Sequence, residues 1–282
     1  MAGKLYIVGT PLGNLGDMSP RAVETLTQVD FIAAEDTRVS LKLLSHFGIK
    51  KPMVSYYEHN MRQRGQEILA RIAAGENAAI ITDAGMPCIS DPGEDLVRLC
   101  EEFGIETVVV PGPSALIAAL AASGLATGRF AFEGFLSVKK GSRFSHLEEV
   151  KADTRTLIFY EAPHKLLRTL QDMLAIWGDR PVTLARELTK IHEEIVRTTL
   201  AEAVALYTEK APRGEFVLVI AGAQPGEPEE ISLEAAVQMV LERAREGVSL
   251  SVAAKETARE TGLKKGDLYQ AALEAKENNE TD

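Results

Sequence analysis

Cysteine is scarce in this sequence, which has only Cys88 and Cys100 among its 282 residues. Two cysteines are too few for a structural zinc site made of thiolates. The start of the chain runs straight into an apolar segment and shows no signal-peptide pattern. Two cysteines without a secretion signal favour reduced thiols in the cytoplasm. No uninterrupted apolar stretch reaches the length of a membrane span. We therefore expect a cytoplasmic protein without a membrane segment.

Several common site signatures are also missing. The spacing of Gly9, Gly13 and Gly16 does not fit the dinucleotide pattern G-x-G-x-x-G, and no P-loop Gly-Lys-Ser/Thr is present. His192 has no second histidine at ligand spacing, so no metal site is predicted. The formal net charge of −10 argues against non-specific binding of nucleic acid by the whole surface. A local basic groove remains compatible with that charge.

Three loops rich in glycine and proline are the most informative feature that is present. Each loop follows a short apolar run that is typical of a buried strand. The loops are Gly9 to Leu15, Asp83 to Pro87 and Pro111 to Ala115. If the three strands are parallel in one sheet, the loops gather at its carboxyl edge, where open α/β folds bind ligands. The sequence therefore predicts a pocket built from all three loops.

Strand and helix patterns alternate through the first two-thirds of the chain, which predicts an α/β fold with helices on both faces of a mostly parallel sheet. A second set of strands, from Phe130 to Ala221, shows more alternation toward its end and predicts a mixed sheet. We expect an N-terminal α/β domain over 1–112 and a C-terminal α/β domain over 113–224.

The last segment, 225–282, differs in composition from the rest. The stretch 223–228 is a linker by its proline, glycine and glutamate content. Three helices are expected beyond it, arranged like a helix–turn–helix. Acidic residues outnumber basic ones there, so we expect packing or dimer contact rather than reading of a nucleic-acid duplex.

Charged residues at the ends of predicted strands are the candidates for chemistry. Asp36 and Arg38 follow the second strand, where Asp36 has two interpretations of equal weight, a wall of a polar site or a helix cap. Asp83 has no evident structural task, whereas Asp91 precedes Pro92 and is expected to start a helix. The segment 186–194 ends a strand with Arg-Glu, which favours a site over a solvated loop.

The second half of the chain contains a locally basic stretch, although the chain as a whole is acidic. Lys139, Lys140 and Arg143 are the predicted contacts to RNA phosphates, and His164 is a further candidate. A solvated loop is the alternative interpretation of these residues.

Taken together, the loops resemble those of the small-subunit ribosomal RNA 2′-O-ribose methyltransferases, which belong to the tetrapyrrole methylase (class III) superfamily. The resemblance spans roughly Lys4 to Ala272. The motifs that carry it are Gly9-Thr10-Pro11-Leu12-Gly13-Asn14-Leu15, Glu35-Asp36-Thr37-Arg38, the eleven residues from Asp83 to Gly93, Pro111-Gly112-Pro113-Ser114-Ala115, Phe159-Tyr160-Glu161-Ala162-Pro163-His164 and Arg186-Glu187-Leu188-Thr189-Lys190.

The resemblance implies two α/β domains with S-adenosylmethionine bound in the cleft between them, and a homodimer. It also implies methylation of a decoding-site cytidine in 16S rRNA, with the rRNA or the small ribosomal subunit as partner. The residues that it implies for cofactor binding are Pro11, Leu12, Asp83, Gly85, Met86, Ile89, Ser114, Ala115, Glu161 and Ala185.

A ribose hydroxyl is a weak nucleophile, so methyl transfer to it needs a base or a field of cations. The candidates are Lys190, Glu193, Asp36 and Arg38, and the sequence does not choose among them. Two other functions stay open at this point. One is a porphyrinoid methylase with the same cofactor cleft, and the other is a non-catalytic RNA-binding or ribosome-assembly module.

Overall fold

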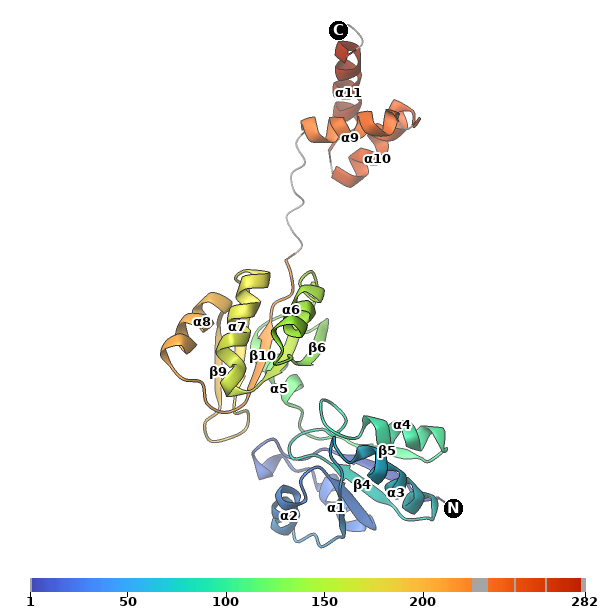
Figure 1. Cartoon of the computed structure of the whole chain (residues 1–282), viewed down its shortest axis with the longest axis vertical. Helices are drawn as coiled ribbons and strands as arrows, with labels where there is room; N and C mark the ends of the chain where they lie inside the picture. The colour runs from blue at the N-terminus through green and yellow to red at the C-terminus, as the bar shows by residue number, and fades with distance from the viewer. Residues whose placement is uncertain (1, 225–232, 246, 262, 280–282) are drawn as a thin grey trace. The chain divides into compact units, whose positions relative to one another are not determined.

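The structure is a computed structural model of the chain that describes residues 2–224, 233–245, 247–261 and 263–279 (Figure 1). These residues form two compact units, which divide after Gly222. Most of the expected linker, from position 225 onward, lies outside the described residues. Each unit has its own hydrophobic core and is described by itself.

The first half of the larger unit contains a five-stranded parallel sheet with the strand order β3-β2-β4-β1-β5. The strands are β1 (Leu5–Val8), β2 (Phe31–Ala34), β3 (Met53–Ser55), β4 (Ala78–Ile81) and β5 (Thr107–Val110). β1 lies between β4 and β5, so the strands that precede the three glycine-rich loops are neighbours. This arrangement brings all three loops to one sheet edge, as the sequence predicted.

Helices cover both faces of this sheet. They are α1 (Pro20–Gln28), α2 (Thr37–His46), α3 (Met61–Ala73) and α4 (Glu94–Glu102), with a short 3-10 helix η1 (Leu15–Asp17) in the first loop. Phe31 packs in one core cluster with residues of α3 and α4, and the next residue, Ile32, packs in another with residues of α1 and α2. Alternate side chains thus point to opposite helical layers, which explains why these strands are continuously apolar.

The second half of the larger unit contains another five-stranded sheet, with the order β6-β7-β10-β8-β9. Its strands are β6 (Phe130–Phe135), β7 (Thr156–Glu161), β8 (Pro181–Arg186), β9 (Glu194–Thr199) and β10 (Phe216–Ile220). Only β6 and β7 are parallel, and the other neighbours are antiparallel. The sheet is therefore mixed, in agreement with the alternation of its later strands.

One face of this sheet packs against three helices and the other against one. The helices are α5 (Ala115–Ser123), α6 (Lys140–Glu149), α7 (Pro163–Trp177) and α8 (Leu200–Glu209). Leu157 and Phe159 of β7 share a core cluster with residues of α6, α7 and α8, whereas Ile158 packs with Leu116 and Leu120 of α5. The helix that follows the third glycine-rich loop is thus part of the second sheet's packing.

The smaller unit is helical. It consists of α9 (Leu233–Arg245), α10 (Leu250–Thr261) and α11 (Lys265–Asn279). Val240, Ala254 and Leu268, one from each helix, belong to its apolar cluster. Among the helices that the structure describes, none is long and apolar enough to cross a membrane.

Candidate active site

The three glycine-rich loops are joined by backbone contacts. Thr10 and Gly85 exchange two hydrogen bonds, with N···O distances of 2.9 and 3.1 Å, and the Thr10 hydroxyl donates to the carbonyl of Thr82. Gly9 lies against Gly112, close enough that a Cβ on either one would overlap the other's backbone. Backbone contacts therefore join the loops after β4, β1 and β5 into one continuous wall.

A cleft of about 380 Å³ lies between this wall and the second sheet. This volume is within the usual range for a small-molecule site. Nine residues for which the sequence predicted cofactor contact line it: Leu12, Asp83, Gly85, Met86, Ile89, Ser114, Ala115, Glu161 and Ala185. Pro11 is buried behind the loop and does not line the cleft. The structure thus gathers in one place residues that are up to 173 positions apart in the chain (185 − 12 = 173).

Three carboxylates that follow strands of the first sheet form an acidic wall of the cleft: Glu35, Asp83 and Asp91. Glu35 accepts a hydrogen bond of 2.5 Å from the Thr82 hydroxyl, and Asp83 accepts one of 3.2 Å from the backbone of Asp36. Burial and the nearby charge of Glu35 raise the pKa of Asp91 to about 7, although the neighbouring Thr82 hydroxyl opposes the shift. The same two causes raise the pKa of Asp83. The wall therefore favours a cationic ligand.

Asp36 and Arg38 lie outside this lining. Asp36 is the N-cap of α2 and accepts a 2.8 Å hydrogen bond from the backbone N–H of Arg38. The Arg38 guanidinium, 2.6 Å from the Asp36 carboxylate, lowers the pKa of Asp36 well below its usual range. Asp36 thus has the capping role, and it is its neighbour Glu35 that lines the cleft.

Lys190, on the loop between β8 and β9, lines the same cleft. Its ammonium lies 3.0 Å from the Glu187 carboxylate and 2.9 Å from that of Glu215. Burial lowers the pKa of Lys190, but the hydrogen bonds to Glu215 and Glu187 outweigh it, so the net shift is upward and the side chain stays charged. Its aliphatic stem packs against Gly13 of the first loop, where a Cβ would overlap it.

Strained backbone is concentrated on two loops of the site. Among the described residues, the non-glycine residues with φ in the left-handed region are Cys88 and Ser90 on one loop and Glu187 and Thr189 on the other. Such conformations cost on the order of 1–3 kcal/mol each and persist where the surroundings determine them. Glu193 helps to hold the second loop, since its carboxylate accepts a 2.6 Å hydrogen bond from the Thr189 N–H. Glu193 itself does not line the cleft.

The four residues predicted to contact RNA differ in their surroundings. Lys139, Lys140 and His164 are exposed, and the Lys140 ammonium lies 5.0 Å from the ring centroid of Phe144. Arg143 is only 3% exposed, because its guanidinium pairs with Asp172 at 2.6 Å and donates to the carbonyls of two preceding residues. The positive charge of Arg143 is thus paired inside the protein.

Sequence reasoning missed some of the residues that line the cleft. Asp91 is not the start of a helix, because α4 begins at Glu94 with Gly93 as its N-cap, and the Asp91 side chain faces the cleft instead. The signal that could have identified Asp91 is its position in the segment from Thr82 to Gly93, which includes the second glycine-rich loop and is rich in Gly, Pro and Asp. Glu215 carried no signal, since it precedes a strand and reaches the site only through the pairing of β10 with β8.

Within residues 2–224 and the described helices beyond them, no group of three or more His, Cys, Asp or Glu side chains is arranged to hold a metal ion.

Comparison with known proteins gives matches over nearly the whole chain. The family of tetrapyrrole (corrin/porphyrin) methylases matches residues 4–204, and the RsmI C-terminal HTH domain matches residues 232–276. A protein of Synechocystis sp. named ribosomal RNA small subunit methyltransferase I is 52% identical over 273 residues, which cover 96% of this chain and 98% of that protein.

Two further relatives are informative. A Thermotoga maritima protein of the same name is 49% identical over 222 residues, which is 79% of this chain but 100% of that protein. That length equals the length of the larger unit. Among solved structures, uroporphyrin-III C-methyltransferase from Thermus thermophilus, complexed with S-adenyl homocysteine, has a TM-score of 0.56 and 20% identity over 77% of this chain and 97% of that one.

Proposed function

The chain belongs to the tetrapyrrole methylase family, and we propose that it methylates 16S rRNA of the small ribosomal subunit with S-adenosylmethionine as donor. The proposed acceptor is the ribose 2′-hydroxyl of a decoding-site cytidine, and the proposed place of action is the cytoplasm. The observation that carries the proposal is that one cleft is lined both by the acidic wall and by Lys190.

The residues of the cleft fit the proposed donor. Its adenosine needs apolar contact and close backbone approach, which Leu12, Ile89 and Gly85 offer. Its positive charges suit a wall of carboxylates, and Asp83 and Asp91 supply that wall. When bound, the donor supplies an electrophilic methyl group on a positively charged sulfur.

Lys190 is the one of the four catalytic candidates that lines the cleft. Because its ammonium stays charged, it stabilises the negative charge that develops on the ribose oxygen as its proton leaves. Arg38 has no base function, since a guanidinium does not lose its proton in proteins. Asp36 is a weak base, because its ion pair lowers its pKa.

Glu187 and Glu215 flank the Lys190 ammonium and differ in exposure. The side chain of Glu187 is 18% exposed, whereas that of Glu215 is 81% exposed. The Glu215 carboxylate can therefore accept the hydroxyl proton and release it to water. Glu187 also accepts a 2.9 Å hydrogen bond from the backbone of Glu215, so its role is to position Lys190.

The proposed RNA surface beside the cleft includes the exposed residues Lys139, Lys140 and His164. Arg143 is left out of it, because its guanidinium is buried against Asp172. The proposal also includes a homodimer. Two exposed apolar residues support the dimer. Ile117 of α5, a helix of apolar and small residues on all sides, is 49% exposed, and Val109 on the edge strand β5 is 53% exposed. Sedimentation of the protein checks the dimer.

The decisive experiment measures transfer of a labelled methyl group to small ribosomal subunits that lack the modification, followed by mapping of the modified nucleotide. The wild type is expected to label a cytidine 2′-oxygen. Lys190→Met is expected to lower kcat by about 10²-fold, the effect of losing one transition-state stabilising group. Glu193→Gln, a change on the same loop, is the matched control and is expected to keep near-native activity. Labelling of a tetrapyrrole but not of RNA would overturn the proposal.

A further inference from the structure

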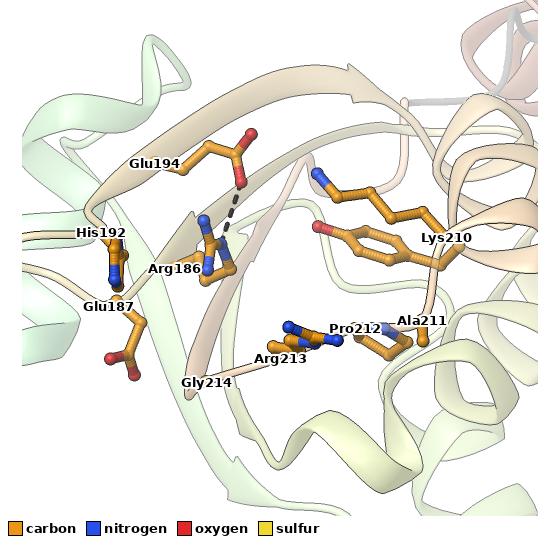
Figure 2. A pocket seen from close by; sticks show the side chains of 10 residues that line it. Arg186, Glu187, His192, Glu194, Lys210, Ala211, Pro212, Arg213 and Gly214 are labelled. Atoms are coloured by element: carbon orange, nitrogen blue, oxygen red, sulfur yellow. Dashed lines mark hydrogen bonds and ion pairs between the residues drawn. The ribbon is translucent and has the colours of Figure 1, made fainter.

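A second pocket adjoins the active site on the other side of Glu187. It has a volume of about 560 Å³ and lies between the end of β8, the start of β9 and the turn that joins α8 to β10 (Figure 2). Gly214, with a φ of +79°, brings this turn against the Glu187 side chain, where a Cβ would lie 2.5 Å from the Glu187 Cγ. Apart from Glu187, which positions Lys190, the residues of this pocket have no part in the proposed chemistry.

The walls of the pocket carry two cations that no acidic residue in the described part of the chain neutralises. Lys210 and Arg213 are exposed, and neither forms an ion pair with any residue that the structure describes. Figure 2 shows both side chains around the same space as Arg186. The carboxylates of this pocket are already engaged, since Glu194 pairs with Arg186 at 2.9 Å and Glu187 pairs with Lys190 at 3.0 Å. The unpaired charge in the pocket is therefore positive.

The pocket and the active-site cleft are direct neighbours. Glu187 lines both of them, and its carboxylate contacts the Lys190 ammonium on the cleft side. The backbone N–H of Glu187 donates to the carbonyl of Glu215 at 3.0 Å, which ties the residue shared by the two spaces to the lining of the cleft. A polynucleotide whose ribose lies at Lys190 continues on either side of that sugar with a phosphate, and this pocket lies beside that position.

We propose that this pocket binds a phosphodiester of the RNA backbone next to the nucleotide that is methylated, with Lys210 and Arg213 as the cations that hold it. The inference rests on the proposed function, because it assumes an RNA substrate in the cleft. Phosphate contacts of this kind fix the position of the chain without reading its sequence. The two residues thus set the affinity for the substrate and leave the methyl-transfer step unchanged.

The test compares the wild type with the double variant Lys210→Ala/Arg213→Ala in binding to small ribosomal subunits over a range of salt. The slope of log affinity against log salt is expected to fall by about one unit for the lost phosphate contact. KM for the subunits is expected to rise about 10-fold, with kcat and donor affinity unchanged. Lys210→Arg/Arg213→Lys keeps both charges and is expected to retain the wild-type slope.

The matched control is Lys42→Ala/Lys50→Ala, which removes two exposed lysines that form no ion pair with any described residue and is expected to leave slope and KM unchanged. Equal slopes and KM values for the Lys210/Arg213 variant and this control would overturn the phosphodiester site. The phosphodiester site would also be overturned if the Lys210/Arg213 variant bound subunits more weakly but bound protein-free rRNA as the wild type does. That result would assign the pocket to contact with a ribosomal protein. Absence of methyl transfer by the wild type would instead overturn the proposed function.

Discussion

The backbones of Gly9 and Gly112 touch, so that a Cβ on Gly9 would lie 2.6 Å from the Cα of Gly112, and a Cβ on Gly112 would lie 2.8 Å from the Cα of Gly9. This contact joins the loop after β1 to the loop after β5. Neither position has the space for any side chain, so glycine is required at both for packing. The wall of the cleft therefore depends on the absence of two side chains.

Gly112→Ala is expected to destabilise the protein by about 1–3 kcal/mol, because an extra methyl group in a well-packed contact forces the backbone to move. Donor affinity is expected to fall with it, since the moved loop carries Ser114 and Ala115. Urea unfolding and calorimetry with S-adenosylmethionine measure the two effects. Gly128→Ala is the control, because nothing lies within 4 Å of its Cβ position. Equal stability of the two variants would contradict the prediction.

Asp91 is expected to make donor binding depend on pH. Its pKa of about 7 means that the carboxylate gains its charge near neutral pH, which strengthens attraction to a cationic donor. Donor affinity is expected to rise between about pH 6 and about pH 8, and Asp91→Asn is expected to flatten this rise. Calorimetric titration at several pH values checks it. An Asn variant with the full wild-type pH dependence would exclude Asp91 as the source.

The same group is expected to affect stability with the opposite sign. A raised folded-state pKa means that the folded protein holds the Asp91 proton over a range where the unfolded chain has lost it. Between about pH 4 and about pH 7, Asp91 therefore makes the protein less stable as pH rises. Asp91→Asn is expected to exceed the wild type in thermal midpoint at about pH 8, with a smaller difference at about pH 5. A lower midpoint for the variant at the higher pH would refute this assignment.

Arg143 is expected to contribute to stability rather than to RNA binding. Arg143→Met leaves the Asp172 carboxylate, whose side chain is 15% exposed, without its cation. Removing one partner of a buried pair typically costs about 3–5 kcal/mol. Chemical denaturation measures the loss, and Lys139→Met, a nearby change of an exposed lysine, is expected to stay within about 0.5 kcal/mol of the wild type. An Arg143→Met variant that kept its stability but bound RNA more weakly would contradict the prediction and assign Arg143 to RNA binding.

The two compact units are expected to fold independently. The larger unit contains both sheets and every residue of the cleft, and the smaller has an apolar cluster of its own. A chain that ends at Gly222 is thus expected to keep its thermal midpoint and its donor affinity. Circular dichroism melting and calorimetry check both properties. Loss of donor binding in the shortened chain would show that the helical unit supports the cleft.

The fold class followed from local patterns. Continuous apolar runs such as the one from Ala78 predict buried strands, and glycine and proline at strand ends predict loops, because both signals depend on neighbouring residues. The start of α1 at Pro20 also depends on a neighbouring residue, since the Ser19 hydroxyl accepts a hydrogen bond from the Ala22 N–H. The order of strands and helices then placed the three glycine-rich loops at one sheet edge.

Which charged residues line the cleft depended on tertiary structure. Arg143 is buried because Asp172 lies beside it, 29 positions away in the chain, and Lys190 stays charged because Glu215, 25 positions away, lies at its ammonium. No local pattern separates Lys190 from Glu193, or Glu35 from Asp36. The sequence by itself determined where strands, helices and loops form, since these depend on short-range periodicity and backbone preference. Only the tertiary structure decided which carboxylates and cations face the cleft, because burial and ion pairing depend on residues that are distant in the chain.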